Sequence, residues 1–153
     1  MSYAAHVLGA SRHKRYFPII QRAAESALRE TQAEPGEVSI AVVDEAEMRE
    51  LNRRYAGADE ATDVLSFESG ASDPASGLLV HGDIAICLPI AQAQAEGAGH
   101  DLEAELALLT VHGVLHLTGY DHAKAEDRRR MWERQAAVLH RLGHTFEMPL
   151  EGG

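Results

Sequence analysis

Hydrophobic and polar residues follow two different periods along the chain, and the longer period predicts helices. Apolar side chains that recur every three or four positions share one face of a helix. Residues Phe17 to Thr31 show this spacing until Pro35 and Gly36 interrupt it. Asp44, with Glu47 three positions later, forms a capping-box pattern at the start of another helix. The predicted helices cover residues 17–31, 44–55, 90–97, 101–118 and 123–142.

Shorter segments are rich in β-branched residues or alternate with a period of two, and these segments predict strands. Val38 to Val43 and Thr62 to Phe67 are two of them. Leu78 to Val80, together with Gly82 to Leu88, suggests a third strand or one arm of a hairpin, which Pro89 closes. The predicted fold class is therefore α+β, with a three- to four-stranded sheet and helices packed mainly on one face.

The composition is that of a soluble globular protein, with 45% hydrophobic and 25% charged residues. With 153 residues, no internal repeat and no long linker, we expect one domain over residues 1–153. The net charge of −10 argues against a protein that coats nucleic acid by bulk electrostatics, but it leaves room for a nuclease with a local basic patch. No apolar run is long enough to cross a membrane.

Cysteine content and the N-terminal sequence indicate the compartment. Residues 1–10 lack the charged and apolar regions of a secretory signal. Cys87 is the single cysteine and cannot form an internal disulfide, so we expect a reducing, cytoplasmic location. Because Cys87 lies in an apolar stretch, we interpret it as a buried small hydrophobe rather than a nucleophile.

Three of the nine histidines have the spacing of metal ligands. His112 and His116 are four residues apart near the end of a predicted helix, so their rings share one face. Gly119 can end that helix and reverse the chain, which returns His122 as a third ligand. Three imidazoles leave a fourth position for water, which is typical of a catalytic zinc site. With the glycine included, this spacing arises by chance roughly 0.003 times in such a chain.

The same spacing occurs in metzincin peptidases, which place a glutamate directly after the first histidine as general base. Here that residue is Gly113, so a peptidase is a weak interpretation. Asp121 and Glu105 are nearby in sequence, and either could act as a base or orient a ligand. Nickel or manganese could occupy the same three-histidine site.

Three further motifs accompany the histidines: Leu51-Asn52 with Tyr55, Thr62-Asp63-Val64-Leu65-Ser66-Phe67, and Gly82-Asp83-Ile84. Together with the segment from His112 to His122, they make the chain similar to the YbeY family from about Val38 to Gly143. Met131, Gln135 and Leu139 continue the likeness on the last helix. The resemblance implies a small zincin-like domain with one zinc ion on His112, His116 and His122.

The resemblance also implies a function. The family is one of metal-dependent endoribonucleases that are selective for single-stranded RNA. They mature the 3′ end of the small-subunit ribosomal RNA and take part in ribosome quality control. The expected partners are ribosomal RNA and the small ribosomal subunit, and neither a membrane nor DNA is expected.

Site residues follow from the same comparison. His112 and Asp121 are candidate catalytic residues, and Asp63, Ser66 and Asp83 are expected at strand ends that border the cleft, where they could bind substrate. The family places an arginine after its tyrosine, but this chain has Ala56 there, followed by an acidic loop over residues 57–61. A cationic role would then pass to Arg53, in substrate binding, or to Arg54, in catalysis. His81 could also reach the cleft.

Two alternatives remain open. The chain could be a non-catalytic ribosome assembly factor in which the metal holds the C-terminal turn and helices together. It could also be a metal hydrolase that acts on another substrate. The assembly-factor hypothesis predicts that His116→Ala unfolds the domain, whereas the enzyme hypothesis predicts a folded, inactive variant.

Overall fold

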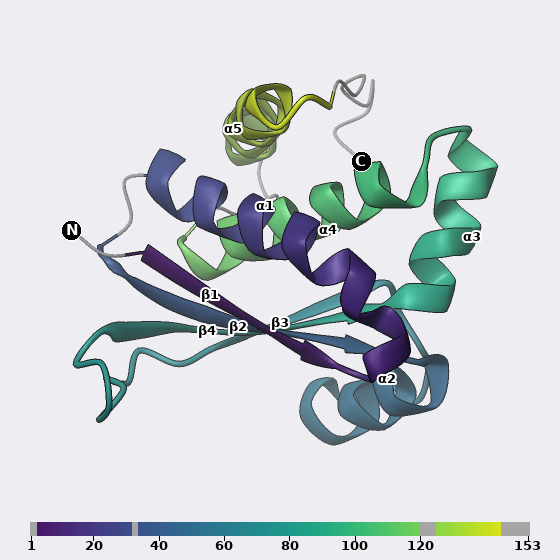
Figure 1. The fold of residues 1–153 in the computed structure, drawn as a ribbon, viewed down its shortest axis with the longest axis horizontal. Coiled ribbons are helices and arrows are strands. Elements are labelled where there is room, and N and C mark those ends of the chain that lie inside the picture. The colour runs from purple at the N-terminus through teal and green to yellow at the C-terminus, as the bar shows by residue number, and fades with distance from the viewer. Residues whose placement is uncertain (1–2, 32–33, 120–124, 145–153) are drawn as a thin grey trace.

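The computed structural model describes residues 3–31, 34–119 and 125–144. Its centre is a four-stranded mixed sheet in the order β1-β2-β4-β3 (Figure 1). β1, β2 and β4 are parallel to one another, and β3 pairs with β4 in the antiparallel direction at one edge. The strands are β1 (Tyr3–Gly9), β2 (Gly36–Val43), β3 (Val64–Glu68) and β4 (Leu79–Cys87).

Helices cover the sheet mainly on one side, as the sequence predicts. α1, α4 and α5 lie above the sheet in Figure 1, whereas α2 lies below it and α3 lies at one end. The helices are α1 (Phe17–Glu30), α2 (Glu45–Leu51), α3 (Leu88–Ala98), α4 (Leu102–Leu117) and α5 (Ala125–Arg141). A 3-10 turn, η1 (Ser11–Tyr16), precedes α1, and a π-helical turn, η2 (Asn52–Ala56), extends α2. These observations confirm the α+β class.

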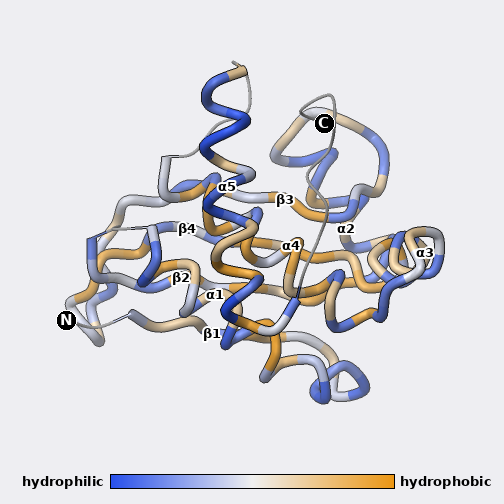
Figure 2. The backbone as a smooth tube through the Cα atoms, turned by 90° about the horizontal axis from the view of Figure 1, so that it is seen from above, coloured by the Kyte–Doolittle hydropathy of each residue, from blue (hydrophilic) through white to orange (hydrophobic). Residues whose placement is uncertain are grey.

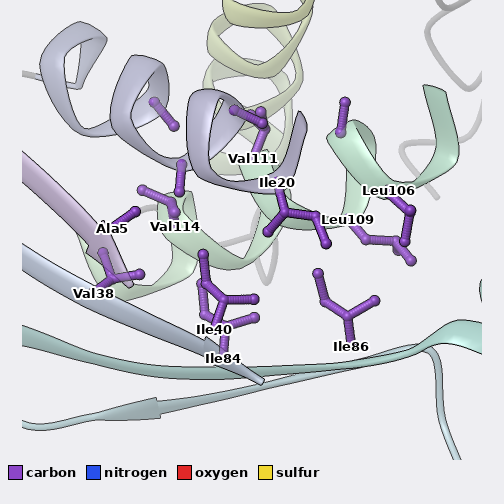
Figure 3. Packing of buried hydrophobic residues seen from close by; sticks show 14 of the residues in the cluster. Ala5, Ile20, Val38, Ile40, Ile84, Ile86, Leu106, Leu109, Val111 and Val114 are labelled. Carbon is purple, nitrogen blue, oxygen red and sulfur yellow. The ribbon is translucent and has the colours of Figure 1, made fainter. Parts of the chain in front are cut away.

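The main core lies between the sheet and α1 and α4. Ile40 of β2 and Ile84 of β4 are register partners, and both point from the strands toward Ile20 of α1 and Val114 of α4 (Figure 3). α4 has buried residues on most of its circumference, which is the pattern of a helix at the centre of a protein. In Figure 2 the hydrophobic stretches accordingly gather in the middle of the molecule, around α4. This burial fixes α4 firmly against the sheet.

Local sequence signals explain several element ends. Asp44 caps α2: its Oδ1 accepts from the Glu47 amide at 2.9 Å, and Glu47 Oε1 accepts from the Asp44 amide at 3.3 Å. The predicted capping box is thereby confirmed. The helix predicted over 44–55 is divided, because the α-helical part ends at Leu51 and η2 follows. Within the described ranges, no helix is long and apolar enough to cross a membrane.

The structure differs from the sequence prediction at one strand and at one helix start. β1 was not predicted, although it forms the outer parallel strand beside β2. β4 ends at Cys87, before Pro89 as expected, but α3 begins at Leu88 rather than at the predicted Ile90, so Pro89 occupies the first turn of the helix. Proline is tolerated there because its missing N–H would have no partner within the helix in any case.

Gly82 allows the edge of the sheet to form. It has φ +155°, and a Cβ atom at this position would lie 2.2 Å from the carbonyl oxygen of Phe67 on β3. Only glycine therefore permits β3 to pair with β4 at Glu68 and Gly82. β4 is one continuous strand with a bulge beside β2, so residues 78–80 and 82–88 belong to the same element. It pairs in the antiparallel direction with β3, the preceding strand, as the arm of a hairpin would.

Candidate metal centre

The C-terminal half of α4 carries two histidines whose reactive nitrogens converge. The Nε2 atoms of His112 and His116 lie 3.1 Å apart. The two ring centroids are 4.6 Å apart and the planes are inclined by 80°. Both side chains are partly buried. The four-residue spacing on a helix therefore produces the shared face that the sequence predicts.

This separation fits two ligands of one small ion. Imidazole nitrogens bind zinc at about 2.0–2.1 Å, so two of them in tetrahedral geometry stand roughly 3.3 Å apart. The observed 3.1 Å is close to that value. Within residues 3–31, 34–119 and 125–144, no three histidine, cysteine, aspartate or glutamate side chains form a group that could hold a metal ion. The predicted third ligand, His122, and the candidate catalytic Asp121 lie outside the described residues.

One glutamine touches the histidine pair from the neighbouring helix. His112 Nδ1 lies 3.1 Å from Oε1 of Gln135 on α5. Gln135 is 1% exposed and shares the buried face of α5 with Met131, Val138 and Leu139. In the sequence Gln135 appears only as part of the family likeness. The signal that could have singled it out is a polar residue at a position with the spacing of the apolar face.

His112 and His116 line a cleft of about 360 Å³ that lies between α4 and β3. Such a volume lies at the lower end of the range of small-molecule sites in proteins. Its described lining consists of Val64, Leu65, Ser66, Glu68, His112, His116 and Leu117. Ser66 places its hydroxyl 3.5 Å from the carbonyl oxygen of Gly113, and Glu68 adds a carboxylate that the sequence did not point out.

Gly113 explains how α4 comes so close to the sheet. A Cβ atom there would lie 3.0 Å from Cδ1 and 3.2 Å from Cγ2 of Ile84, and 3.3 Å from Oγ of Ser66. A side chain at position 113 would therefore point into the sheet. The glutamate that peptidases carry after their first histidine has no room here, which strengthens the case against a peptidase.

Ser66 and Asp83 were expected at strand ends, but both lie inside strands. β3 is an edge strand with alternating faces, so Ser66 faces the histidine cleft. Asp83 is exposed on β4 and borders a different hollow, of about 380 Å³, that also contacts Leu51, Tyr55 and Phe67 near α2. The structure therefore brings Ser66, but not Asp83, to the histidines.

Asp63 lies directly before β3, where it organises the strand. Its Oδ1 accepts hydrogen bonds from the Val64 amide at 2.8 Å and the Thr62 hydroxyl at 3.3 Å. Its backbone carbonyl accepts from the amide of Cys87 at 2.9 Å. Asp63 is absent from the described lining of the cleft.

Glu105, considered above as a base, lies two turns before His112 on α4. It is buried, and its Oε1 is 2.6 Å from Nε2 of His100. In the orientation of the Gln94 carboxamide that gives both its oxygen and its nitrogen hydrogen-bond partners, the nitrogen donates to Oε2 of Glu105 at 3.1 Å and to Oδ2 of Asp63 at 3.3 Å. Glu105 thus joins α3 to α4, and it does not line the described part of the cleft.

The two candidate arginines lie on η2, away from the histidines. Both are exposed and pair with Glu50, Arg53 at 2.7 Å and Arg54 at 3.3 Å. The hydrogen bond from Arg53 is the main cause that lowers the pKa of the Glu50 carboxyl. The guanidinium of Arg54 also lies 5.9 Å from the ring of Tyr55. Neither arginine is among the described residues that line the cleft.

Two remaining residues have structural positions. Nε2 of His81 lies 2.9 Å from the carbonyl oxygen of Glu34, beside the start of β2, and His81 does not reach the described part of the cleft. Cys87 is fully buried, and this burial raises the pKa of its thiol. The interpretation of Cys87 as a buried hydrophobe is confirmed.

The fold and the site together define a class: small α+β proteins with a four-stranded mixed sheet and a histidine-lined cleft between a central helix and an edge strand. A family model described as endoribonuclease YbeY matches residues 9–143. The chain belongs to the YbeY family, as the motifs around the histidines indicated.

Individual relatives agree with this assignment. The chain is 45% identical over 131 residues to endoribonuclease YbeY of Pelotomaculum thermopropionicum, which covers 83% of this chain and 86% of that protein. It is 42% identical over 116 residues to endoribonuclease YbeY of Staphylococcus saprophyticus, covering 73% and 76%. The solution structure of TM1509 from Thermotoga maritima has a TM-score of 0.64 at 28% identity, covering 89% of this chain and 87% of that one.

Proposed function

We propose that this protein is a metal-dependent endoribonuclease that cleaves single-stranded RNA, with one zinc ion held by His112, His116 and His122. The observation that carries the proposal is the 3.1 Å separation of the two Nε2 atoms at the wall of an open cleft. The relatives named endoribonuclease YbeY support the reaction and the substrate class. The zincin-like arrangement remains part of the proposal.

The chemistry follows from the residues that surround the cleft. A zinc ion bound by these histidines would supply a Lewis acid, which could polarise a phosphoryl oxygen or lower the pKa of a bound water. Ser66, at the cleft wall, has a hydroxyl that can donate to a phosphate oxygen. The carboxylate of Glu68, in the same cleft, can accept a proton from an attacking water. Asp121 stays the second candidate for that role.

The other predicted substrate contacts depend on the path of the RNA. Arg53 and Arg54 lie on η2, and Asp83 borders the hollow that Tyr55 also lines. β3 is the edge strand and borders both, because Phe67 lines this hollow whereas Ser66 and Glu68 line the histidine cleft. An RNA strand that passes over the edge of β3 would meet both groups of residues. Asp63, which organises the start of β3, would act indirectly.

We also propose that the substrate is the 3′ region of small-subunit ribosomal RNA, that the small ribosomal subunit is the partner and that the location is cytoplasmic. Family membership supports this assignment. The chain acts as a single domain over residues 1–153 in this proposal. The four strands in one sheet and the shared core of α1, α4 and α5 support that view.

The test compares wild type with His116→Ala on a single-stranded RNA oligonucleotide and on its duplex. Zinc-loaded wild type should cleave the single strand in preference to the duplex and should lose this activity on chelation. His116→Ala should be folded and inactive. His140→Ala is the matched control, because His140 is an exposed histidine on α5, and it should retain full activity.

The same experiment separates the alternatives. A non-catalytic assembly factor would bind small subunits, cleave no RNA and unfold when His116 is replaced. Cleavage by His116→Ala at the wild-type rate, or full activity in excess chelator, would contradict the proposed metal site.

A further inference from the structure

Gln135 is the one polar residue in a row of buried apolar residues on α5. Met131, Val138 and Leu139, at spacings of three and four residues from it, are 2%, 0% and 1% exposed, and Gln135 itself is 1% exposed. The three apolar residues belong to the main core and pack α5 against it. An apolar side chain of the same size would serve this packing at least as well, because a buried amide is stable only when its hydrogen bonds are made. The position of Gln135 therefore calls for a polar partner.

That partner is the first histidine of the candidate metal centre. Oε1 of Gln135 lies 3.1 Å from Nδ1 of His112, 23 residues earlier in the chain. A carbonyl oxygen only accepts hydrogen bonds, so the proton of a neutral His112 ring must reside on Nδ1. The opposite nitrogen, Nε2, then carries the lone pair. It is the nitrogen that faces Nε2 of His116 at 3.1 Å.

We propose that Gln135 is a positioning residue that fixes the tautomer and the ring orientation of His112, so that the Nε2 lone pair is presented to a metal ion before the ion arrives. The inference rests on the proposed function in one respect: the ion that His112 binds is taken to be the catalytic zinc. The hydrogen bond joins α5 to α4, so it also couples the packing of α5 on the core to the geometry of the metal site. Partners of this kind to a metal-binding histidine typically change metal affinity about 10- to 100-fold when they are removed.

The tautomer is measured directly in the metal-free protein. Nitrogen-15 NMR at a pH where the rings are neutral distinguishes a protonated imidazole nitrogen from an unprotonated one, and His112→Asn identifies the signals of His112. Wild type should show His112 protonated on Nδ1. A predominantly Nε2-protonated His112 in wild type would overturn the proposal without any further variant.

Two substitutions at position 135 then separate the hydrogen bond from the packing. Gln135→Met keeps the length of the side chain and removes the acceptor. It should bind zinc about 10- to 100-fold more weakly in competition with a chromophoric chelator, and it should lose the preference of His112 for the Nδ1 proton. Gln135→Glu keeps an acceptor oxygen and should restore both properties. Gln92→Met, the same change at an exposed residue of α3, is the control and should match wild type.

The outcomes distinguish this inference from the proposed function. If Gln135→Met binds zinc as tightly as wild type and keeps the Nδ1 proton, Gln135 has no positioning role, whatever the activity of the protein. If a folded Gln135→Glu loses affinity as strongly as Gln135→Met, packing rather than the acceptor matters, and the proposal is overturned. If the tautomer and affinity behave as described but zinc-loaded wild type cleaves no RNA, the positioning role stands and the proposed function fails.

Discussion

Gly113 provides a test of how closely the metal-bearing helix is held against the sheet. In Gly113→Ala the new Cβ would lie 3.0 Å from Cδ1 of Ile84, which is 1% exposed and has little room to move. Overpacking of this kind costs about 1–3 kcal/mol. Replacing a glycine inside a helix by alanine stabilises the folded state by about 1 kcal/mol through helix propensity. We therefore expect a net loss of about 1 kcal/mol in the free energy of unfolding.

The contact itself can be isolated with a second substitution. Ile84→Val removes Cδ1 and alone should cost about 1 kcal/mol. Because it also removes the atom nearest to the new Cβ, the double variant should cost about 1 kcal/mol rather than the sum of about 2 kcal/mol. The coupling is thus about 1 kcal/mol in the favourable direction. Urea unfolding of the four metal-free proteins, followed by circular dichroism, measures it.

Gly97 supplies the control for this cycle. It lies in α3, and a Cβ there would meet nothing within 4 Å. Gly97→Ala should therefore stabilise the protein by about 1 kcal/mol through helix propensity alone. Equal stabilisation by Gly113→Ala, or a double-mutant cycle without coupling, would refute the close approach of α4 to β4.

Four further perturbations have defined outcomes. Glu68→Gln should lower the rate of RNA cleavage at saturating substrate at least about a hundredfold without changing zinc affinity, because a general base contributes a factor of about 10² or more. An unchanged rate would show that Glu68 is not the general base. Chelation should lower the melting temperature of wild type, whereas that of His116→Ala should not respond, because an ion bound only to the folded state stabilises it. Asp44→Ala should cost about 1 kcal/mol in urea unfolding by removing the cap of α2, with zinc affinity unchanged. Cys87→Ala should remove a fall in stability at alkaline pH. Burial raises the pKa of the Cys87 thiol in the folded state, so the unfolded chain binds fewer protons above its own thiol pKa of about 8.5, and stability is lost as pH rises through that value. A wild-type curve parallel to that of Cys87→Ala between about pH 8 and 10 would contradict this linkage.

The helices were the most predictable part of the fold. α1 and α4 were expected at residues 17–31 and 101–118 and are found at Phe17–Glu30 and Leu102–Leu117. Their ends depend on local chemistry, such as Asp101, whose side chain accepts from the amide of Ala104 at 2.8 Å. The residues that make such a cap are only a few positions apart in the chain, so the sequence alone reveals them.

The missed strand depends on distant residues instead. β1 has the sequence Tyr-Ala-Ala-His-Val-Leu-Gly, which contains few β-branched residues and no clear alternation. It forms because its backbone pairs with β2, from Tyr3 opposite Gly36 to Gly9 opposite Val42. Such long-range pairing overrides a weak local preference.

The residues of the site also fall into two groups, those that local sequence spacing predicts and those that tertiary packing brings together. The convergence of His112 and His116 follows from helical spacing and was predicted. The contacts of Gln135 and Glu68 come from α5 and β3, which tertiary packing brings to α4. Arg53, Arg54 and Asp83 were assigned from their places in motifs, and the structure puts them on η2 and beside the second hollow. Motif membership therefore indicated the family but not which of these residues share one cleft.

Titration of the metal-free protein with zinc links the histidine site to the reaction. Bound zinc and the rate of cleavage of a single-stranded RNA are recorded at each step for wild type, for His112→Ala and for the control His140→Ala. We predict that the rate of wild type and of the control rises in proportion to bound zinc and stops rising at about one ion per chain, whereas His112→Ala neither binds tightly nor cleaves. A rate that is independent of bound zinc, or a His112→Ala protein that cleaves as wild type does, would contradict a metal-dependent endoribonuclease built on this helix.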